Sequence, residues 1–218
     1  WAKRGFKPVF KSVTDDEAFL AQGDLVVSEN SPTVKEILDF MMLWSDNLLA
    51  DRLAGLAARA AGYPLNIKGI DTIFRTLLAQ FEIDDSKLVV ADASGLSKKN
   101  KITAKLMGEL LYKIRKDERY ALLYESLPVG GVSGTLQNRF TTTAPSAVGL
   151  VRAKTGTLNG TATLAGYVQS KDREYVFVTL ADDIAKGNAA LNKARAAIDR
   201  VLGRIAAPNI PAEISPAP

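Results

Sequence analysis

Two short polar segments carry side chains whose types and spacing could do chemistry. Lys154-Thr155-Gly156-Thr157 combines a cation for an anion, hydroxyl donors for its oxygens, and a glycine whose bare backbone a substrate can approach. Ser45-Asp46-Asn47 places a hydroxyl and an amide between two apolar stretches. Alone, the first is also typical of a basic strand edge that discourages aggregation, and the second of a helix N-cap. Their occurrence in one chain favours a shared cleft.

The sequence contains no histidine and no cysteine. The first absence excludes a Ser-His-Asp triad and histidine-based zinc sites, and the second excludes thiol catalysis, disulfides and thiolate metal sites. Any serine chemistry must therefore use lysine, a carboxylate or another hydroxyl as its proton carrier. The pKa of a lysine side chain is ordinarily about 10.4, so a catalytic lysine needs burial or a neighbouring cation to lower it. We expect no metal and no cofactor.

The composition is that of ordinary globular protein, large enough for one sizeable core. Of the 218 residues, 47% are hydrophobic and 24% charged. Its 28 basic and 24 acidic residues give a net charge of +4, too small and too scattered to indicate nucleic-acid binding. No apolar run is long enough to predict a transmembrane segment, and the first residues do not lead into the apolar core of a signal peptide.

Apolar periodicity predicts the elements that position these segments. Strands are expected at Arg152–Thr157, Ala162–Val168 and Tyr175–Leu180, the last two joined by a polar turn, which gives three consecutive antiparallel strands. Helical spacing predicts helices from a Thr33–Glu36 capping box, over Leu49–Ala60 and Ile67–Phe81, after Thr103, and over Ala189–Ile205. We therefore predict an α+β fold, with a helical cluster beside an antiparallel sheet covered by the terminal helix.

The connections carry further expectations. Ser45-Asp46-Asn47 is expected on a short link between two buried helices, which would be a rigid mount for its side chains. Leu127–Leu136 is predicted to be a tight loop and Gln137–Ser146 a flexible approach to the first strand. Asp92, in a turn-forming segment, is expected to bond the backbone of its own loop. Arg152 is expected to point away from the neighbours of Lys154 or toward solvent.

Four segments, in order, resemble those of the class C low-molecular-mass penicillin-binding proteins. They are Trp44–Ala50, Asp92–Ser97, Leu127–Leu136 and Lys154–Thr157. Ser-Asp-Asn and Lys-Thr-Gly are the second and third signatures of the penicillin-recognising serine acyltransferases. The resemblance covers roughly Ser31 to Gly203. It implies a serine D-Ala-D-Ala carboxypeptidase or endopeptidase that acts on cell-wall peptidoglycan, is acylated by β-lactams, and works in the periplasm or cell-wall space.

The resemblance also implies roles for these residues. The catalytic residues would be Ser45, which relays a proton toward the leaving D-alanine nitrogen, Asn47, which bonds the substrate amide, and Lys154, which holds Ser45 and attracts the substrate carboxylate. The substrate-binding residues would be Thr155, Gly156 and Thr157. The two threonine hydroxyls would bind the carboxylate, and the Thr157 N–H would donate half of an oxyanion hole. The partners implied are the peptidoglycan stem peptide and β-lactam antibiotics.

The family's first signature, Ser-x-x-Lys, is absent, because no serine in this sequence has lysine three positions later. We expect the acylated serine in an N-terminal portion of the same enzyme, which would be a partner of this chain and without which the chain is inactive. Residues 1–30 are then expected to be the end of an inserted domain or a linker. Residues 31–207 would be the C-terminal part of the penicillin-binding catalytic domain, and residues 208–218 an extended tail.

Two alternatives stay open at this point. A class A β-lactamase shares Ser-Asp-Asn and Lys-Thr-Gly, but it should carry a deacylating glutamate in a Glu-x-x-Leu-Asn loop. The segment Glu82-Ile83-Asp84-Asp85-Ser86 does not match that loop. The second alternative is a non-catalytic peptidoglycan-binding fragment that retains the carboxylate site without the chemistry.

Overall fold

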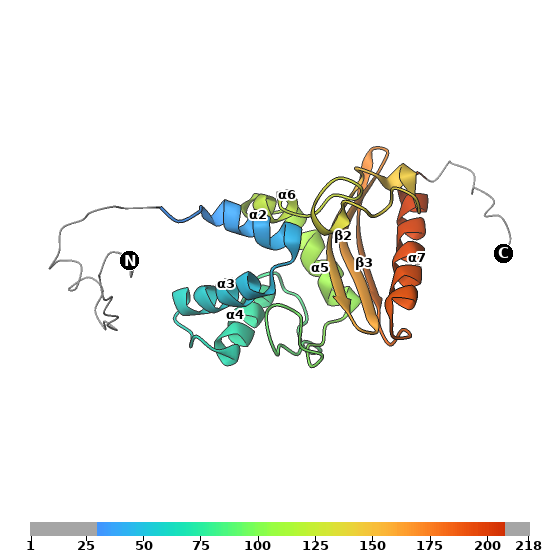
Figure 1. The fold of residues 1–218 in the computed structure, drawn as a ribbon. Coiled ribbons are helices and arrows are strands. Elements are labelled where there is room, and N and C mark those ends of the chain that lie inside the picture. Colours follow the sequence, from blue (N-terminus) through green and yellow to red (C-terminus); the bar gives the residue numbers. More distant parts are fainter. Residues whose placement is uncertain (1–29, 208–218) are drawn as a thin grey trace, which may run out of the picture. The chain divides into compact units, whose positions relative to one another are not determined.

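The computed structural model describes residues 30–207, and the account below concerns the unit that begins at Thr33. Its elements are α2 (Val34–Trp44), α3 (Asn47–Ala60), α4 (Ile67–Gln80), α5 (Ala104–Arg115), η2 (Glu118–Tyr120), α6 (Ala121–Glu125), η3 (Gly134–Leu136), η4 (Pro145–Ala147), β1 (Val151–Leu158), β2 (Thr161–Ser170), β3 (Arg173–Ala181) and α7 (Asn188–Ala206) (Figure 1). The predicted α+β fold is confirmed. Residues 1–29 of the expected linker and the whole expected tail lie outside the described residues.

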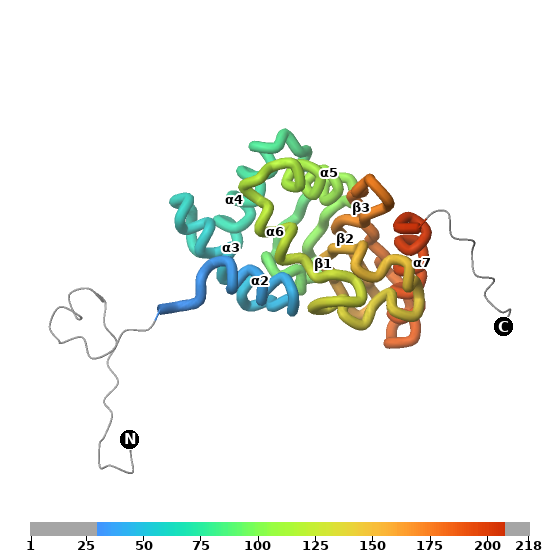
Figure 2. The backbone as a smooth tube through the Cα atoms, turned by 90° about the horizontal axis from the view of Figure 1, so that it is seen from above, coloured from blue at the N-terminus to red at the C-terminus, as the bar shows by residue number. Residues whose placement is uncertain are grey.

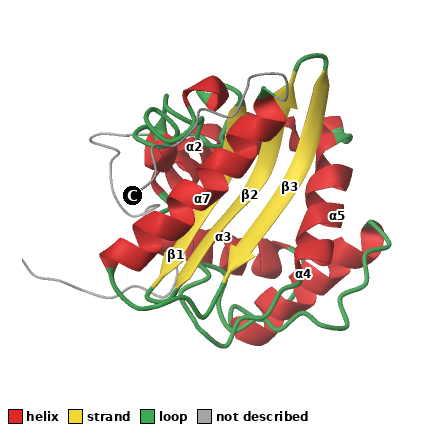
Figure 3. Cartoon of the chain, turned by 90° about the vertical axis from the view of Figure 1, so that its right-hand side faces the viewer, coloured by secondary structure: helices red, strands yellow, loops and turns green. Residues whose placement is uncertain are grey.

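The three strands form one antiparallel sheet in the order β1-β2-β3, as the alternation predicted. Helix α7 lies across one face of the sheet (Figure 3), where η4 packs against it, and the other α-helices lie on the other side of the strands (Figure 2). The core under α7 includes Phe140, Val151, Leu164 and Leu202, and the core on the opposite face is centred on Tyr167. None of the helices in this described part is long and apolar enough to cross a membrane.

The pleat of β1 assigns its residues to these two faces. Val151 and Ala153 are fully buried toward α7. Arg152 and Lys154, which alternate with them, share the opposite face, because residues two positions apart on a strand point the same way. The Arg152 guanidinium carbon lies 5.3 Å from the centroid of the Tyr124 ring on that face. The expectation that alternation turns Arg152 away from the neighbours of Lys154 was therefore wrong, although the side chain is partly exposed to solvent.

Helix α2 begins with the expected capping box. The Glu36 N–H donates to Thr33 Oγ1 at 3.3 Å, and the Thr33 N–H donates to Glu36 Oε2 at 2.7 Å. The helix itself has no buried residue, and Val34 and Trp44 are 66% and 53% exposed. Apolar spacing predicts which side chains share a helix face but not what covers that face. The expectation that Ser45 follows a buried helix was therefore wrong.

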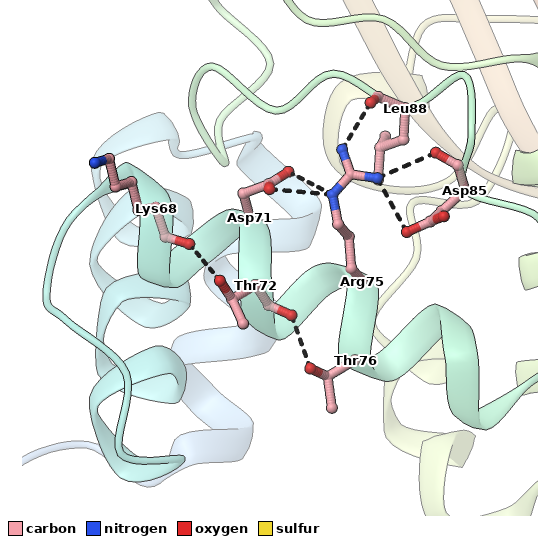
Figure 4. Close-up of polar contacts among 7 residues, drawn as sticks. All are labelled: Lys68, Asp71, Thr72, Arg75, Thr76, Asp85 and Leu88. Carbon is pink, nitrogen blue, oxygen red and sulfur yellow. Dashed lines mark hydrogen bonds and ion pairs between the residues drawn. The ribbon is translucent and has the colours of Figure 1, made fainter.

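Arg75 of α4 fixes the connection that follows this helix (Figure 4). Its Nε donates to both carboxylate oxygens of Asp71, and its Nη1 donates to Asp85 Oδ2 at 3.0 Å. Its Nη2 donates to the Leu88 carbonyl oxygen at 2.9 Å. One guanidinium thus anchors residues 85–88, which lead to the loop that contains Asp92.

The segment Gln137–Ser146 is packed into the protein rather than flexible. Phe140 is 1% exposed, and Asp199 of α7 is 2% exposed and faces this segment. Arg139 Nη2 lies 2.5 Å from Asp199 Oδ1, and the Thr143 hydroxyl donates to Asp199 Oδ2 at 3.0 Å. Buried charges need partners, and removal of one partner of such a pair typically costs about 3–5 kcal/mol. The polar side chains that suggested flexibility are the anchors of the segment.

Candidate active site

Ser45 lies in the turn between α2 and α3, and its hydroxyl does not cap either helix. It is the C-cap residue of α2, with φ 59° and ψ 48°, and its backbone N–H donates to the Met41 carbonyl oxygen. The N-cap of α3 is Asp46, whose Oδ1 accepts the Leu49 N–H at 2.8 Å. The helix-cap interpretation of Ser-Asp-Asn is therefore satisfied by Asp46. Asn47, the first residue of α3, is exposed.

Lys154 of β1 reaches the Ser45 hydroxyl from the far end of the sequence. Its Nζ donates to Ser45 Oγ at 2.5 Å and to the Thr155 carbonyl oxygen at 3.2 Å. Burial lowers the pKa of Lys154 to about 8 from its ordinary 10.5, because desolvation disfavours the charged ammonium group. A lysine in this state is still largely protonated at neutral pH but releases its proton more readily than an exposed one.

The outer edge of β1 presents backbone donors beyond the end of a short pairing with residues 128–130. The Gly130 N–H donates to the Val151 carbonyl oxygen, and the Ala153 N–H donates to the Pro128 carbonyl oxygen. Backbone groups of alternate residues point to the same side of an antiparallel strand. The N–H groups of Thr155 and Thr157 therefore also point to this edge. Within the described residues β1 is the outer strand of the sheet there.

Gly156 is required by its neighbour across the strand pair. It lies opposite Thr163 of β2, and a Cβ at position 156 would lie 2.3 Å from Thr163 Oγ1. The Thr163 hydroxyl donates to the Gly156 carbonyl oxygen at 3.4 Å. The glycine thus permits close strand packing on the Lys154 face. Its expected role as open backbone for a substrate stays a prediction.

The hydroxyls of Thr155 and Thr157 lie on the opposite face of β1 from Lys154, as alternation requires. Thr155 Oγ1 bonds to Thr135 Oγ1 at 2.9 Å, and Arg195 Nη2 of α7 donates to Thr157 Oγ1 at 3.0 Å. Neither partner was identified from the sequence. Thr135 belongs to Leu127–Leu136, a segment that the resemblance had already singled out. Arg195 carries no comparable signal, because it reads as one of several basic residues on an amphipathic helix.

The loop before β1 contacts both parts of the site. Its residues 128–130 pair with β1, and its turn η3 packs against the last turn of α2. Gly134, with φ 55°, makes this approach possible, since a Cβ there would lie 2.5 Å from the Leu43 carbonyl oxygen. Leu43 lies two residues before Ser45. One loop therefore sets the spacing between the element that carries Ser45 and the strand that carries Lys154.

The loop around Asp92 has the structure expected of it. Asp92 Oδ1 accepts the Gly95 N–H at 2.7 Å, and its Oδ2 accepts the Ser97 N–H at 2.6 Å. Asp51 of α3 attaches the same loop, because its Oδ1 accepts the N–H groups of Ala93 and Ser94 at 2.9 Å. The prediction that Asp92 bonds its own loop is confirmed, and the carboxylate has a structural function here.

Comparison with known proteins gives this arrangement a family. Residues 1–205 match the D-Ala-D-Ala carboxypeptidase 3 (S13) family. The chain belongs to that family. Carboxypeptidase DacB of Mycolicibacterium smegmatis is 34% identical over 207 residues, which are 93% of this chain and 45% of that protein. D-alanyl-D-alanine carboxypeptidase DacB of Haemophilus influenzae is 33% identical over 181 residues, which are 80% of this chain and 37% of that protein.

The solved structures agree with this assignment. The S13 chain superposes on penicillin-binding protein 4 (dacB) of H. influenzae with a TM-score of 0.69 and 30% identity, covering 77% of this chain and 38% of that one. The same protein complexed with a β-lactam gives a TM-score of 0.68. The resemblance seen in the sequence is confirmed. The chain spans less than half the length of these relatives.

Proposed function

We propose that this S13 chain forms the Ser45–Lys154 side of the active site of a serine D-Ala-D-Ala carboxypeptidase or endopeptidase. The enzyme would cleave peptidoglycan stem peptides through an acyl-enzyme in the periplasm or cell-wall space, and β-lactams would acylate it. The observation that carries the proposal is the 2.5 Å hydrogen bond between Lys154 Nζ and Ser45 Oγ, which joins two motifs far apart in the sequence. Family membership and the named activities of the two DacB relatives support the substrate class.

The acylated serine comes, in this proposal, from a portion of the enzyme outside these 218 residues. No serine in the sequence has a lysine three positions later, and the relatives are more than twice as long as the matched region. Exposed apolar side chains flank Ser45 on both sides, namely Phe40, Trp44 and Leu48 at 51%, 53% and 61% exposure. Such a patch beside a polar motif is typical of a surface that another part of the protein covers. We assign it to the portion that brings the nucleophile.

In the acylation step, the serine oxygen attacks the carbonyl carbon of the penultimate D-alanine while its own proton passes to a base of the same portion, the lysine of the Ser-x-x-Lys signature, which returns it to Lys154 at the end of the step. The peptide C–N bond then breaks as the terminal D-alanine nitrogen takes a proton. Ser45 Oγ gives that proton, and Lys154, which donates to the same oxygen, stabilises the negative charge that develops there and replaces the proton. Because Lys154 has a pKa lowered to about 8, this transfer is easier than from an exposed lysine. Water later hydrolyses the acyl-enzyme.

The edge of β1 binds the substrate. The Thr157 N–H points to that edge and would donate half of the oxyanion hole, while the N–H of the acylated serine would donate the other half. The hydroxyls of Thr155 and Thr157 would receive the terminal carboxylate, and Asn47 would bond the peptide amide of the bound stem. Gly156 keeps β1 close to β2 behind this edge.

The test uses the complete protein, with penicillin labelling and D-alanine release from an acylated D-Ala-D-Ala peptide as readouts. Lys154→Ala should lower both rates by about 10²- to 10⁴-fold, the usual contribution of a positioned acid-base group. Lys113→Ala, at an exposed position of α5, is the matched control and should change neither rate. Failure of the unmodified protein to react with either compound would overturn the proposal. Unchanged rates in Lys154→Ala would remove this residue from the site.

A further inference from the structure

We infer that Arg195 of α7 supplies the positive charge of the carboxylate-binding site and thereby determines specificity for substrates with a free C-terminal carboxylate. The inference rests on the proposed function and adds a residue that neither the family motifs nor the sequence analysis assigns. It starts from one contact, the hydrogen bond from Arg195 Nη2 to Thr157 Oγ1 at 3.0 Å.

The two faces of β1 separate the hydroxyls from the lysine of their own motif. Lys154 extends to the face where it meets Ser45, whereas the Thr157 side chain extends to the face covered by α7. A carboxylate bonded to the Thr157 hydroxyl would lie at most about 6 Å from Arg195 Nη2, because two hydrogen bonds of about 3 Å in series would separate them. Opposite charges at that distance attract measurably. Arg195 is thus the cation bonded to the hydroxyl that receives the anion.

Arg195 also decides which way the Thr157 hydroxyl points. A hydroxyl has one proton and two acceptor lone pairs, and a guanidinium can only donate. Thr157 Oγ1 therefore accepts from Arg195 and must direct its own proton to another partner. An anion requires a donor of this kind. The Thr155–Thr135 pair has no such direction, since either hydroxyl can be the donor in that bond.

The turn of α7 that carries Arg195 is held in place by the rest of the protein. The Arg195 carbonyl oxygen accepts from Arg139 Nη2 at 3.3 Å, and the buried Arg139–Asp199 pair lies one turn further along α7. Arg139 follows the loop that pairs with β1 at residues 128–130. The Arg195 side chain itself remains partly exposed, so a ligand can reach it. The charge is therefore both positioned and accessible.

The experiment compares two substrates on the complete protein. One is an acylated D-Ala-D-Ala peptide with its free carboxylate, and the other is the same peptide with a C-terminal carboxamide. Arg195→Gln should lower kcat/KM for the carboxylate substrate by about 10- to 100-fold, chiefly through KM, because the bond to the charged group forms before the chemical step. The carboxamide rate should stay within about twofold. Arg195→Lys should keep an intermediate preference, because it retains the charge but not the fork of donors.

Lys193→Gln, at an exposed position on the same helix, is the matched control and should leave both rates unchanged. The ratio of the two kcat/KM values does not depend on the folded fraction, so it remains informative for a destabilised variant. Equal losses on both substrates, or an unchanged ratio in Arg195→Gln and Arg195→Lys, would overturn this inference while the proposed function stands. If the unmodified protein cleaves neither substrate, the proposed function fails and this inference fails with it.

Discussion

The two faces of strand β1 are built differently. On one face the long Lys154 side chain is mostly withdrawn from solvent and bonds the Ser45 hydroxyl directly. On the other face short threonine side chains stay near the edge, and each is bonded by a residue from elsewhere, Thr135 for Thr155 and Arg195 for Thr157. In the function proposed above, the first face moves a proton and the second holds an anion.

This difference follows from the pleat of a single strand. Lys-Thr-Gly-Thr is continuous in the sequence, but successive side chains of a strand point to opposite faces. The motif therefore places the lysine and the threonine hydroxyls, which the proposed function assigns to proton transfer and carboxylate binding, in two separate environments, while its backbone N–H groups remain on the shared edge. We expect changes on the Lys154 face to act mainly on the rate of chemistry, and changes on the hydroxyl face to act mainly on binding.

The largest separation of rate from stability is expected for Ser45→Ala. It should lower acylation of the complete protein by about 10²- to 10⁴-fold, as loss of a positioned acid-base group does. Its stability should change little, because the N-cap of α3 is Asp46. The matched variant is Asp46→Ala, which should cost about 1 kcal/mol through loss of the cap. Acylation kinetics and thermal melts check the pair, and a normal rate in Ser45→Ala would leave that face without its proton carrier.

Gly156→Ala should lower the free energy of unfolding, because the new side chain cannot be packed on the Lys154 face of the sheet. The new Cβ would lie 2.3 Å from Thr163 Oγ1, so the strands must shift, and overpacking of this kind typically costs about 1–3 kcal/mol. Removal of the obstructing hydroxyl in Gly156→Ala/Thr163→Ala should restore part of the loss. A double-mutant cycle of unfolding free energies measures this coupling. Strictly additive effects would show that Thr163 is not what requires a glycine here.

The strands and most helices could be predicted from the sequence because they depend on local periodicity. The alternation around Ala162–Val168 and the Thr33–Glu36 capping box are properties of neighbouring residues. The pairing of Ser45 with Lys154 was accessible only through the resemblance, since it joins distant segments. The sequence nevertheless predicted the element that carries each motif, a turn between helices for Ser45-Asp46-Asn47 and a strand edge for Lys154-Thr155-Gly156-Thr157.

What could not be predicted depends on long-range partners. The polar residues of Gln137–Ser146 indicated flexibility, because the sequence does not reveal that Arg139 meets Asp199 in the core. Helix α2 has the spacing of a buried helix but lies exposed in the described part of the chain. Arg195 resembles any arginine on an amphipathic helix until the packing of α7 places it beside Thr157.

The pH dependence of acylation and of stability should reflect the ionisation of Lys154. If charged Lys154 supports the Ser45 hydroxyl, acylation should fall as the pH rises through about 8, by up to about tenfold per unit above that value. The free energy of unfolding should change in the opposite direction and rise with pH. The unfolded chain keeps this proton up to 10.5 and the folded chain only up to about 8, so folding becomes more favourable with rising pH between these values. The cost of burying the charge is fully present below about 8.

Lys154→Met should remove the contribution of Lys154 to the pH dependence of both acylation and stability, because it removes the amino group and leaves every other titratable group in place. The stability difference between Lys154→Met and the unmodified protein should shift between pH 8 and 10.5 in favour of the unmodified protein. Denaturant melts across that range measure it. An acylation rate that rises through about pH 8 would instead indicate that the neutral amine is the active form, with Lys154 acting as a base.

The smallest effect is expected for Thr135→Val, which keeps the shape of the side chain and removes its hydroxyl. The Thr155–Thr135 bond is a neutral hydrogen bond worth about 0.5–1.5 kcal/mol net, so its loss should lower kcat/KM by no more than about tenfold. The effect should appear in KM rather than kcat, because in the proposed function this face binds the substrate carboxylate. Thr157, oriented by Arg195, should still donate to the carboxylate in this variant. The same carboxylate and carboxamide peptides measure it, and a loss in Thr135→Val larger than that in Arg195→Gln would make Thr155 the principal donor of this face.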